Sequence, residues 1–402
     1  MPSNSNDQSE LTRREYVACG GTVIAGGLLS GCTGSSGSDP PNSTDSETTT
    51  GTTTTTATES KPTETAATDK PYRVTVEPVG EVMFETVPQT WVAENASWAD
   101  MGVALGLTKP SAVVLTGEYR TWHYEDVPGL SPSKSDMSSL WQDGISKELL
   151  LEIDAGVHFI DPNYMANLIP NWGRSDVEEM HERVGPFCGN TSFSTYSWHE
   201  DYPYYSLYEA TEKVAAVFQR QDRFRALSNL HEAFLDRLKE RLPPEDQRPE
   251  IALLSPGSIE PETFYPYRLG DRTAYKHWRD LGVSDALAGS EIQSFTSDRG
   301  TIDYEPLLEI DPEVLMLYTD THRTDAAFED TYRSFLQDHD TASQLTAVQN
   351  GAVYPAGGMY QGPIINLSKT ERAAKQLFPD EFDEEETLYD RQRIADIRAG
   401  EI

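Results

Sequence analysis

Two stretches of this chain repeat one pattern. Residues 144–161 read GISKELLLEIDAGVHFID, and residues 300–318 read GTIDYEPLLEIDPEVLMLY. In each, a polar lead-in precedes a Glu and a Leu-Leu-Glu-Ile-Asp core, and an apolar run follows the Asp. Paired leucines at helical spacing favour a short amphipathic helix, and the apolar run favours a buried parallel strand. The sequence therefore predicts one helix–strand unit that is used twice.

The separation of the two copies indicates the fold class. Glu148 of the first copy and Glu305 of the second lie 157 residues apart, whereas solenoid repeats recur every ~20–50 residues. We therefore expect an α/β protein with two similar lobes, each carrying the unit once, and a ligand cleft between them. The alternative is a chance likeness between two amphipathic helices.

The N-terminus has the pattern of an export signal. A twin arginine in TRREYV (residues 12–17) precedes a weakly apolar stretch that ends in Leu-Ser-Gly-Cys at Cys32. The apolar stretch is about half of the ~20 residues that a membrane span needs. Residues 1–31 resemble a Tat-type lipoprotein signal peptide, which implies a lipid on Cys32 and anchorage to the outer face of the cell membrane. A cytosolic chain with a chance Arg-Arg is the alternative.

Residues 32–71 are rich in Thr, Ser, Gly, Pro and Glu and have few large apolar side chains, so we expect a disordered tether. After it, Cys188 is the one remaining cysteine, which excludes an intrachain disulfide in the body. We expect Cys188 to be a small buried residue. Asn-x-Ser/Thr sequons, which N-glycosylation would require, begin at Asn42, Asn95, Asn190 and Asn366.

The charge balance of the chain indicates the solvent in which the protein works and says little about its binding partners. The chain has 66 acidic and 32 basic side chains, for a formal net charge of −34. In molar salt the Debye length is only ~3 Å, so the self-repulsion of such a surface is largely screened. This acidity resembles a halophilic, haloarchaeal surface. It also argues against nucleic-acid binding, which needs a basic footprint.

A long amphipathic helix is expected over residues 221–242, where Pro243 and Pro244 stop it. It divides the body into an N-terminal lobe at 72–219, a connecting helix at 220–244 and a C-terminal lobe at 245–379. An acidic and poorly ordered tail would follow at 380–402. One helix as the sole connection predicts a stiff hinge and small lobe motion.

Residues 72–378 resemble the substrate-binding proteins of ABC importers for ferric siderophores, cobalamin and haem. The resemblance is carried by residues 95–107, which end in Leu-Gly-Leu, by both copies of the repeat, and by LTAVQNGAVY at 345–354. The first copy departs from the family with Ala155-Gly156 in place of Pro-Asp. In the last motif, Asn350-Gly351 is expected to supply the positive φ angles of a tight turn. The resemblance implies the class III periplasmic-binding fold, with two Rossmann-like lobes joined by one long helix.

The resemblance also implies a ligand site. Trp141 would offer a stacking surface, and Arg299 could pair with anionic hydroxamate, catecholate or carboxylate oxygens. The full set of expected ligand contacts is Trp141, Tyr164, Tyr265, Tyr267, Arg268, Arg299 and Tyr360. The alternative for each aromatic residue is ordinary packing, and for Arg268 an ion pair with a neighbour such as Asp271.

In this family one Glu on each lobe pairs with arginines of the permease, and Glu148 and Glu305 match those positions. Their alternative role is stabilisation of a helix N-terminus by the dipole. The resemblance further implies a monomer that delivers an iron chelate to an ABC permease and its ATPase, without a resident cofactor and without catalysis.

Three other functions are alternatives to this one. A free Zn or Mn receptor needs about three His and a carboxylate, but the eight His show no ligand spacing. An exported hydrolase would need a signature such as Gly-x-Ser-x-Gly or His-Glu-x-x-His, and neither occurs. A surface recognition lipoprotein without a transporter remains a further alternative.

Overall fold

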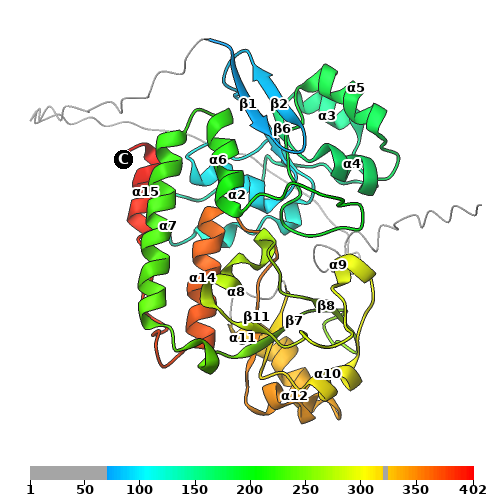
Figure 1. Cartoon of the computed structure of the whole chain (residues 1–402), viewed down its shortest axis with the longest axis vertical. Coiled ribbons are helices and arrows are strands. Elements are labelled where there is room, and N and C mark those ends of the chain that lie inside the picture. The colour runs from blue at the N-terminus through cyan, green and yellow to red at the C-terminus, as the bar shows by residue number, and fades with distance from the viewer. Residues whose placement is uncertain (1–69, 320–324) are drawn as a thin grey trace, which may run out of the picture.

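The computed structural model describes residues 70–319 and 325–402. It shows two α/β lobes, one above the other in Figure 1, with the long helix α7 (Gln221–Arg241) running along one side of both. The expected export signal, Cys32 and most of the tether lie outside the described residues.

The N-terminal lobe is built on a four-stranded parallel sheet in the order β5-β4-β3-β6. All three residues of β3 and of β6 are buried, as in a sheet covered on both faces. Its strands are β3 (Trp91–Ala93), β4 (Ala112–Val113), β5 (Ser138–Ser139) and β6 (Val157–Phe159). Its helices are α2 (Ala96–Ala104), α3 (Lys147–Ile153), α4 (Pro162–Leu168), α5 (Arg174–Val184) and α6 (Leu207–Val217), and an antiparallel hairpin of β1 (Tyr72–Val76) and β2 (Gly80–Phe84) precedes them.

The C-terminal lobe has a five-stranded sheet in the order β11-β10-β7-β8, with β9 also paired to β7. The β8 strand is antiparallel to β7, and the other pairs are parallel. The strands are β7 (Glu250–Pro256), β8 (Phe264–Tyr267), β9 (Ser284–Asp285), β10 (Val314–Leu317) and β11 (Val353–Pro355). The helices are α8 (Lys276–Leu281), α9 (Phe295–Asp298), α10 (Tyr304–Ile310), α11 (Asp325–Phe328), α12 (Ser334–Asp338), α13 (Thr346–Gln349) and α14 (Pro363–Leu377).

The sequence repeat is a structural repeat. Helices α3 and α10 each have seven residues and are capped by Ser146 and Asp303, whose side chains accept hydrogen bonds from the first turn. Both end at an Asp in the left-handed conformation, Asp154 and Asp311, each with φ of 46°. The strands β6 and β10 begin three residues later in both copies. The prediction of one helix–strand unit per lobe is confirmed.

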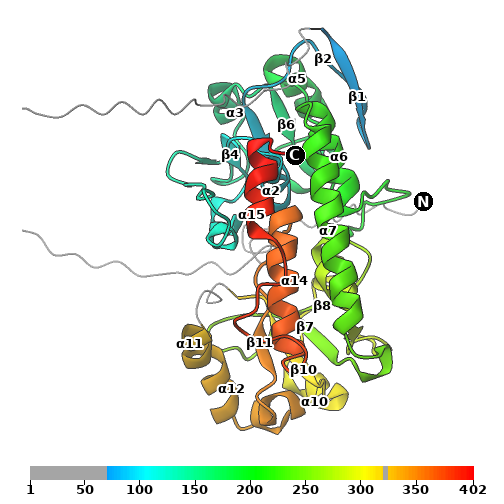
Figure 2. The same ribbon diagram turned by 90° about the vertical axis from the view of Figure 1, so that its left-hand side faces the viewer.

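The long helix that joins the lobes is confirmed, whereas the expectation of a poorly ordered tail is wrong. After α14, the chain returns along α7 and ends in helix α15 (Arg391–Ala399), which lies beside α7 in Figures 1 and 2. Arg398 of α15 donates from Nε to the carbonyl of Val103 in the N-terminal lobe at 2.8 Å. Ile394 and Ile397 are fully buried, so burial of an apolar stripe orders this segment despite its acidity. The C-terminal segment therefore contacts both lobes: Arg398 bonds to the N-terminal lobe, and the backbone N–H of Leu388 donates to Glu371 of α14 in the C-terminal lobe.

Local details sharpen the expected pattern. Trp141 lies in a β-bridge with Ile145, and α3 starts only at Lys147. Residues 193–196, within the described range, form no strand. The Asn350-Gly351 turn is the end of α13: Gly351 has φ of 67°, whereas Asn350, at φ of −85°, is an ordinary helix C-cap.

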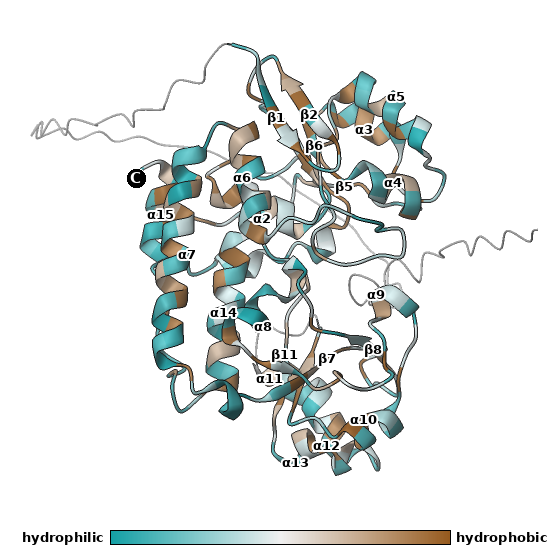
Figure 3. Cartoon of the chain, in the orientation of Figure 1, coloured by the Kyte–Doolittle hydropathy of each residue, from teal (hydrophilic) through white to brown (hydrophobic). Residues whose placement is uncertain are grey.

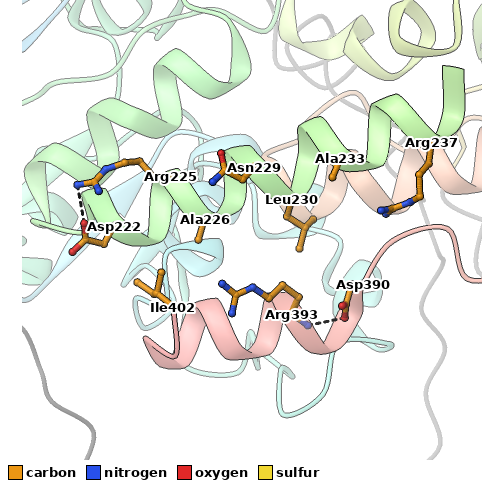
Figure 4. Close-up of a pocket in the computed structure, with 10 residues that line it drawn as sticks. All are labelled: Asp222, Arg225, Ala226, Asn229, Leu230, Ala233, Arg237, Asp390, Arg393 and Ile402. Carbon is orange, nitrogen blue, oxygen red and sulfur yellow. Dashed lines mark hydrogen bonds and ion pairs between the residues drawn. The ribbon is translucent and has the colours of Figure 1, made fainter. Parts of the chain in front are cut away.

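Apolar segments gather inside both lobes, and polar and apolar residues alternate along α7 (Figure 3). Among the described residues, no helix has both the length and the hydropathy to cross a membrane. A groove of about 600 Å³ lies between α7 and α15 on the outer side of the connection (Figure 4). Two of its lining residues, Asp222 and Arg225, form an ion pair with each other at 2.7 Å. This groove is separate from the contacts between the lobes.

Candidate ligand site between the lobes

The segments that follow the parallel strands of the two sheets meet between the lobes. Arg120, beyond β4, lies against Gly358, beyond β11, so closely that a Cβ on Gly358 would be 2.0 Å from Arg120 Nη1. The backbone N–H of Gln361 donates to Ser97 Oγ, beyond β3, at 3.0 Å. Open α/β sheets bind ligands at the carboxyl ends of their strands. The candidate site is therefore this surface between the lobes.

Phe295 of α9 gathers three of the expected ligand residues in the C-terminal lobe. Its ring lies 4.6 Å from the ring of Tyr265 and 6.4 Å from that of Tyr267, and the guanidinium carbon of Arg299 lies 5.3 Å from it. Tyr318, at the end of β10, packs edge-on against Tyr267 at 5.2 Å. Tyr265 and Tyr267 belong to β8, an antiparallel strand that the sequence analysis did not predict.

A row of aromatic rings in contact runs from the N-terminal lobe to the C-terminal lobe. Tyr164 of α4 contacts Tyr196 at 6.5 Å, Tyr196 contacts Phe193 at 6.1 Å, and Phe193 contacts Tyr360 at 5.1 Å, all edge-on. Tyr360 is half-buried, whereas Tyr164 is buried. The sequence analysis thus identified Tyr164 and Tyr360, at the two ends of this row of aromatic rings, and missed Phe193, which lies between them.

Trp141 and Arg268 stand apart from these two groups. Trp141 follows β5 and is half-buried, and its backbone N–H donates to the carbonyl of Val114 at 2.9 Å. Arg268 donates from Nε to Asp285 Oδ2 at 2.8 Å and from Nη1 to the carbonyl of Ile292 at 3.1 Å. Its ion-pair partner is thus Asp285, not Asp271, and this bond favours a packing role. Ligand contact by either residue stays a prediction.

Three basic residues that the sequence analysis did not single out lie near this surface. Arg120 is 9% exposed and pairs with Glu118 at 3.1 Å. Lys134 donates to the carbonyl of Thr116 at 3.0 Å, and its pKa is lowered by burial and then by the charge of Arg120. Lys369 donates to the carbonyl of Gly358 at 2.5 Å, and burial lowers its pKa well below the usual value. The chain has 32 basic against 66 acidic side chains. Because basic residues are the minority, each one in the segments after the strands could have been taken as a candidate ligand contact.

The two glutamates proposed to meet a permease are exposed in the first turns of α3 and α10. Both helices lie on the side of the molecule away from α7 (Figure 1). A backbone hydrogen bond and then a bond from Ser146 lower the pKa of Glu148, and Ser146 Oγ donates to its carboxylate at 2.9 Å. These bonds agree with the alternative role of Glu148, stabilisation of the N-terminus of α3, and they leave its carboxylate at the surface.

In the described ranges, no group of three or more His, Cys, Asp or Glu side chains is placed to hold a free metal ion. His322 lies outside those ranges. His158 is fully buried, stacks on Phe187 at 4.6 Å, and has its pKa lowered to about 4 by burial. It is a core histidine.

Comparison with known proteins agrees with this geometry. Residues 186–358 match the model of a family described as periplasmic binding protein. The chain has the periplasmic-binding-protein fold. No curated protein sequence matches it.

Solved structures with this fold include the triscatecholate siderophore binding protein FeuA from Bacillus subtilis, complexed with ferri-bacillibactin. It is 13% identical, with a TM-score of 0.52, over 77% of this chain and 98% of that one. The petrobactin-binding protein YclQ from Bacillus subtilis is 15% identical, with a TM-score of 0.51, over 79% and 100%. A periplasmic binding protein from Veillonella parvula is 12% identical, with a TM-score of 0.55, over 77% and 98%. At these identities the likeness is one of fold.

Proposed function

We propose that this protein is the extracytoplasmic solute-binding protein of an ABC importer, and that it captures a ferric siderophore or a similar chelate between its lobes. The observation that carries the proposal is the meeting of both sheets' carboxyl ends at one surface with aromatic and basic side chains from each lobe. The N-terminal lobe supplies Arg120 and Tyr164, and the C-terminal lobe supplies Tyr265, Arg299 and Tyr360.

The chemistry of this surface suits a flat, anionic ligand. Tyrosine rings offer hydrophobic faces to aromatic ligand groups. A guanidinium binds pairs of carboxylate or catecholate oxygens in a fixed fork and also stacks on rings. Arg299 has a left-handed backbone, with φ of 60°, which is uncommon for a residue with a side chain. We infer that this conformation holds the guanidinium over Phe295.

A thermal-shift screen in high salt tests the proposal, since a ligand that binds the native state raises its apparent stability. Ferric siderophores of the catecholate, hydroxamate and carboxylate classes, haem and cobalamin form the main panel, with the iron-free siderophores as controls. Zinc and manganese salts form a second arm. We expect at least one ferric chelate to raise the melting temperature, whereas a shift with zinc or manganese alone would favour the free-metal receptor.

Calorimetry then tests the residues. With the chelate found in the screen, Trp141→Ala combined with Arg299→Ala should weaken binding at least tenfold. Arg225→Ala on the outer face of α7 is the matched control, because Arg225 is exposed and far from the lobe contact. Unchanged affinity in the double variant would mean that the site lies elsewhere.

Delivery to a permease is tested separately from capture. Glu148→Lys with Glu305→Lys should abolish uptake by cells and leave the chelate affinity of the purified protein unchanged. Glu152→Lys with Glu309→Lys is the control, since these exposed residues lie on the same two helices. Normal uptake in the first variant would favour a surface recognition lipoprotein or another docking surface.

The proposal also includes a membrane anchor and a high-salt environment. We propose that Cys32 carries the lipid and that the acidic surface is an adaptation to molar salt, in a haloarchaeal setting. Cys32→Ser should release the protein from the membrane fraction into the medium. Retention of this variant in washed membranes would contradict the lipid anchor.

A further inference from the structure

A small cavity lies where the two lobes and helix α14 meet. Its volume is about 10 Å³, which is room for one water-sized particle. It is lined from the N-terminal lobe by Trp122 and His123, from α8 by His277 and Trp278, and from α14 by residues that include Lys369 and Arg372. Its location is distinct from the groove between α7 and α15.

The lining of this cavity is rich in groups that donate hydrogen bonds or carry positive charge. Arg372 is a cation, Lys369 is one when protonated, and Trp278 and His277 can donate ring N–H groups. No Asp or Glu is present among the described residues that line it. In a chain with a formal net charge of −34, a small cavity with this bias is unexpected.

His277 has a defined tautomer. Its ring is fully buried, and Nδ1 lies 3.0 Å from the side-chain nitrogen of Gln361, which also donates to the carbonyls of Thr273 and Ala274. An amide nitrogen cannot accept, so Nδ1 is the acceptor and the ring proton is on Nε2. Within the described part of the chain, His277 Nε2 and Trp278 Nε1 are buried donors without an acceptor. Because Nδ1 is turned to Gln361, Nε2 lies on the opposite edge of a ring that lines the cavity.

Lys369 supplies the second reason to place an anion here. It is 4% exposed. Its ammonium group donates to the Gly358 carbonyl and lies 5.9 Å above the Tyr318 ring, and no carboxylate of the described chain pairs with it. An isolated buried charge is costly, and a buried cation is normally paired or neutralised. Burial accordingly lowers the pKa of Lys369, with a further contribution from Arg120.

We propose that this cavity binds one halide ion, which is chloride in saline surroundings. A halide ion is a monatomic acceptor, somewhat larger than the water-sized particle that the cavity admits. It would satisfy the orphaned N–H donors of His277 and Trp278 and would stabilise the charged form of Lys369. Larger oxyanions exceed the volume, and metal cations are excluded by the positive lining. Because Lys369 also holds the Gly358 carbonyl next to Arg120, the ion would stabilise the joint between the lobes. It would do so whatever solute the protein carries.

The test compares anions at equal ionic strength and equal sodium concentration. Melting temperatures of the whole protein are measured as sodium gluconate, whose anion is too large for the cavity, is replaced by sodium chloride or sodium bromide. Above saturation each tenfold rise in halide should raise the melting temperature by roughly 3 °C. Equal melting temperatures in gluconate and in halide would overturn the proposal.

Lys369→Met should abolish the difference between halide and gluconate. Lys375→Met is the matched control on the same helix, because Lys375 bonds to Glu371 and to the Glu384 carbonyl outside the cavity. A halide effect that survives Lys369→Met would refute this location. Wild-type crystals grown in bromide provide a readout that needs no variant. An anomalous peak beside His277 Nε2 supports the site, and a water without anomalous signal there refutes it.

Discussion

Replacement of Gln361 by Met tests how much one buried polar side chain stabilises the C-terminal lobe where it meets the N-terminal lobe, because the backbone bond to Ser97 is kept. Gln361 is fully buried, and its side-chain nitrogen donates to the carbonyls of Thr273 at 2.7 Å and Ala274 at 2.8 Å. Its oxygen accepts from the side chain of Asn366 at 2.9 Å. Methionine has nearly the same volume, so the change reports hydrogen bonds and not packing.

The expected loss follows from the groups left behind. The Ala274 carbonyl, His277 Nδ1 and the Asn366 amide would each lose their bond to Gln361, whereas the Thr273 carbonyl keeps its bond from the Lys276 backbone N–H. Each buried group that loses its partner costs about 1–3 kcal/mol. Allowing for partial relaxation, the free energy of unfolding should fall by about 4 kcal/mol, which corresponds to a drop of about 8 °C in the melting temperature. Urea unfolding followed by circular dichroism in fixed salt measures this loss.

Gln349→Met is the matched control for this measurement. Gln349 also donates to two carbonyls, those of Ser343 and Gln344, but at an exposed site where water can replace the side chain. Its loss of stability should be under about 0.5 kcal/mol. If the two variants lose equal stability, or Gln361→Met loses less than about 1 kcal/mol, the hydrogen bonds of this buried side chain do not stabilise the fold as argued.

Three further predictions follow from other buried groups. Gly358→Ala should displace Arg120 and weaken chelate binding about tenfold, as measured by calorimetry. The free energy of unfolding should fall by less than about 1 kcal/mol, because the flexible tip of the Arg120 side chain can move aside. Gly270→Ala, whose Cβ would meet nothing within 4 Å, is the control and should bind the chelate normally. Burial raises the pKa of Asp100 to about 7 from 3.8, so its contribution to stability is present below about pH 4 and is lost as the pH rises to about 7. The stability advantage of wild type over Asp100→Asn should therefore shrink from pH 5 to pH 8 in urea titrations, and parallel pH profiles would contradict this. Peptide mapping of the exported protein should find no glycan at three sequon residues that are buried in the fold, and a glycan on folded protein would refute their burial. Those residues are Asn95, Asn190 and Asn366.

The repeat was readable from sequence because each copy carries its own local signals. Leucine spacing, a capping side chain and a terminal Asp all act within about ten residues, and the structure shows α3 and α10 ending at Asp154 and Asp311 with the same φ. The long helix α7 was readable for the same reason, since its apolar stripe and the following prolines are local. The expected span 221–242 differs from the observed one by one residue.

The site was only partly readable because it is assembled from segments far apart in the chain. Tyr265, Tyr267 and Arg299 were identified as candidates, but nothing local indicates that Phe295 gathers them. Arg120 could not be identified because its contact with Gly358 joins residues more than 200 positions apart. The order of the C-terminal tail was missed for a related reason: acidic composition argues against a core, yet Ile394 and Ile397 are buried against other helices.

The contrast between surface and interior bears on how an anionic ligand could reach this protein. At low ionic strength a net charge of −34 would repel such a ligand at distances of tens of ångströms, whereas in molar salt screening limits that repulsion to ~3 Å. The charge of Arg120, which is held between the lobes at 9% exposure, is screened far less, because salt ions do not surround it. High salt should therefore speed association of an anionic chelate and leave its dissociation rate nearly constant, the opposite of the usual salt effect on attraction between opposite charges. A stopped-flow series from 0.1 M to 2 M salt separates the two rates. An association rate that falls with salt would show that the approaching ligand is attracted by the protein as a whole, and would argue against an anionic ligand.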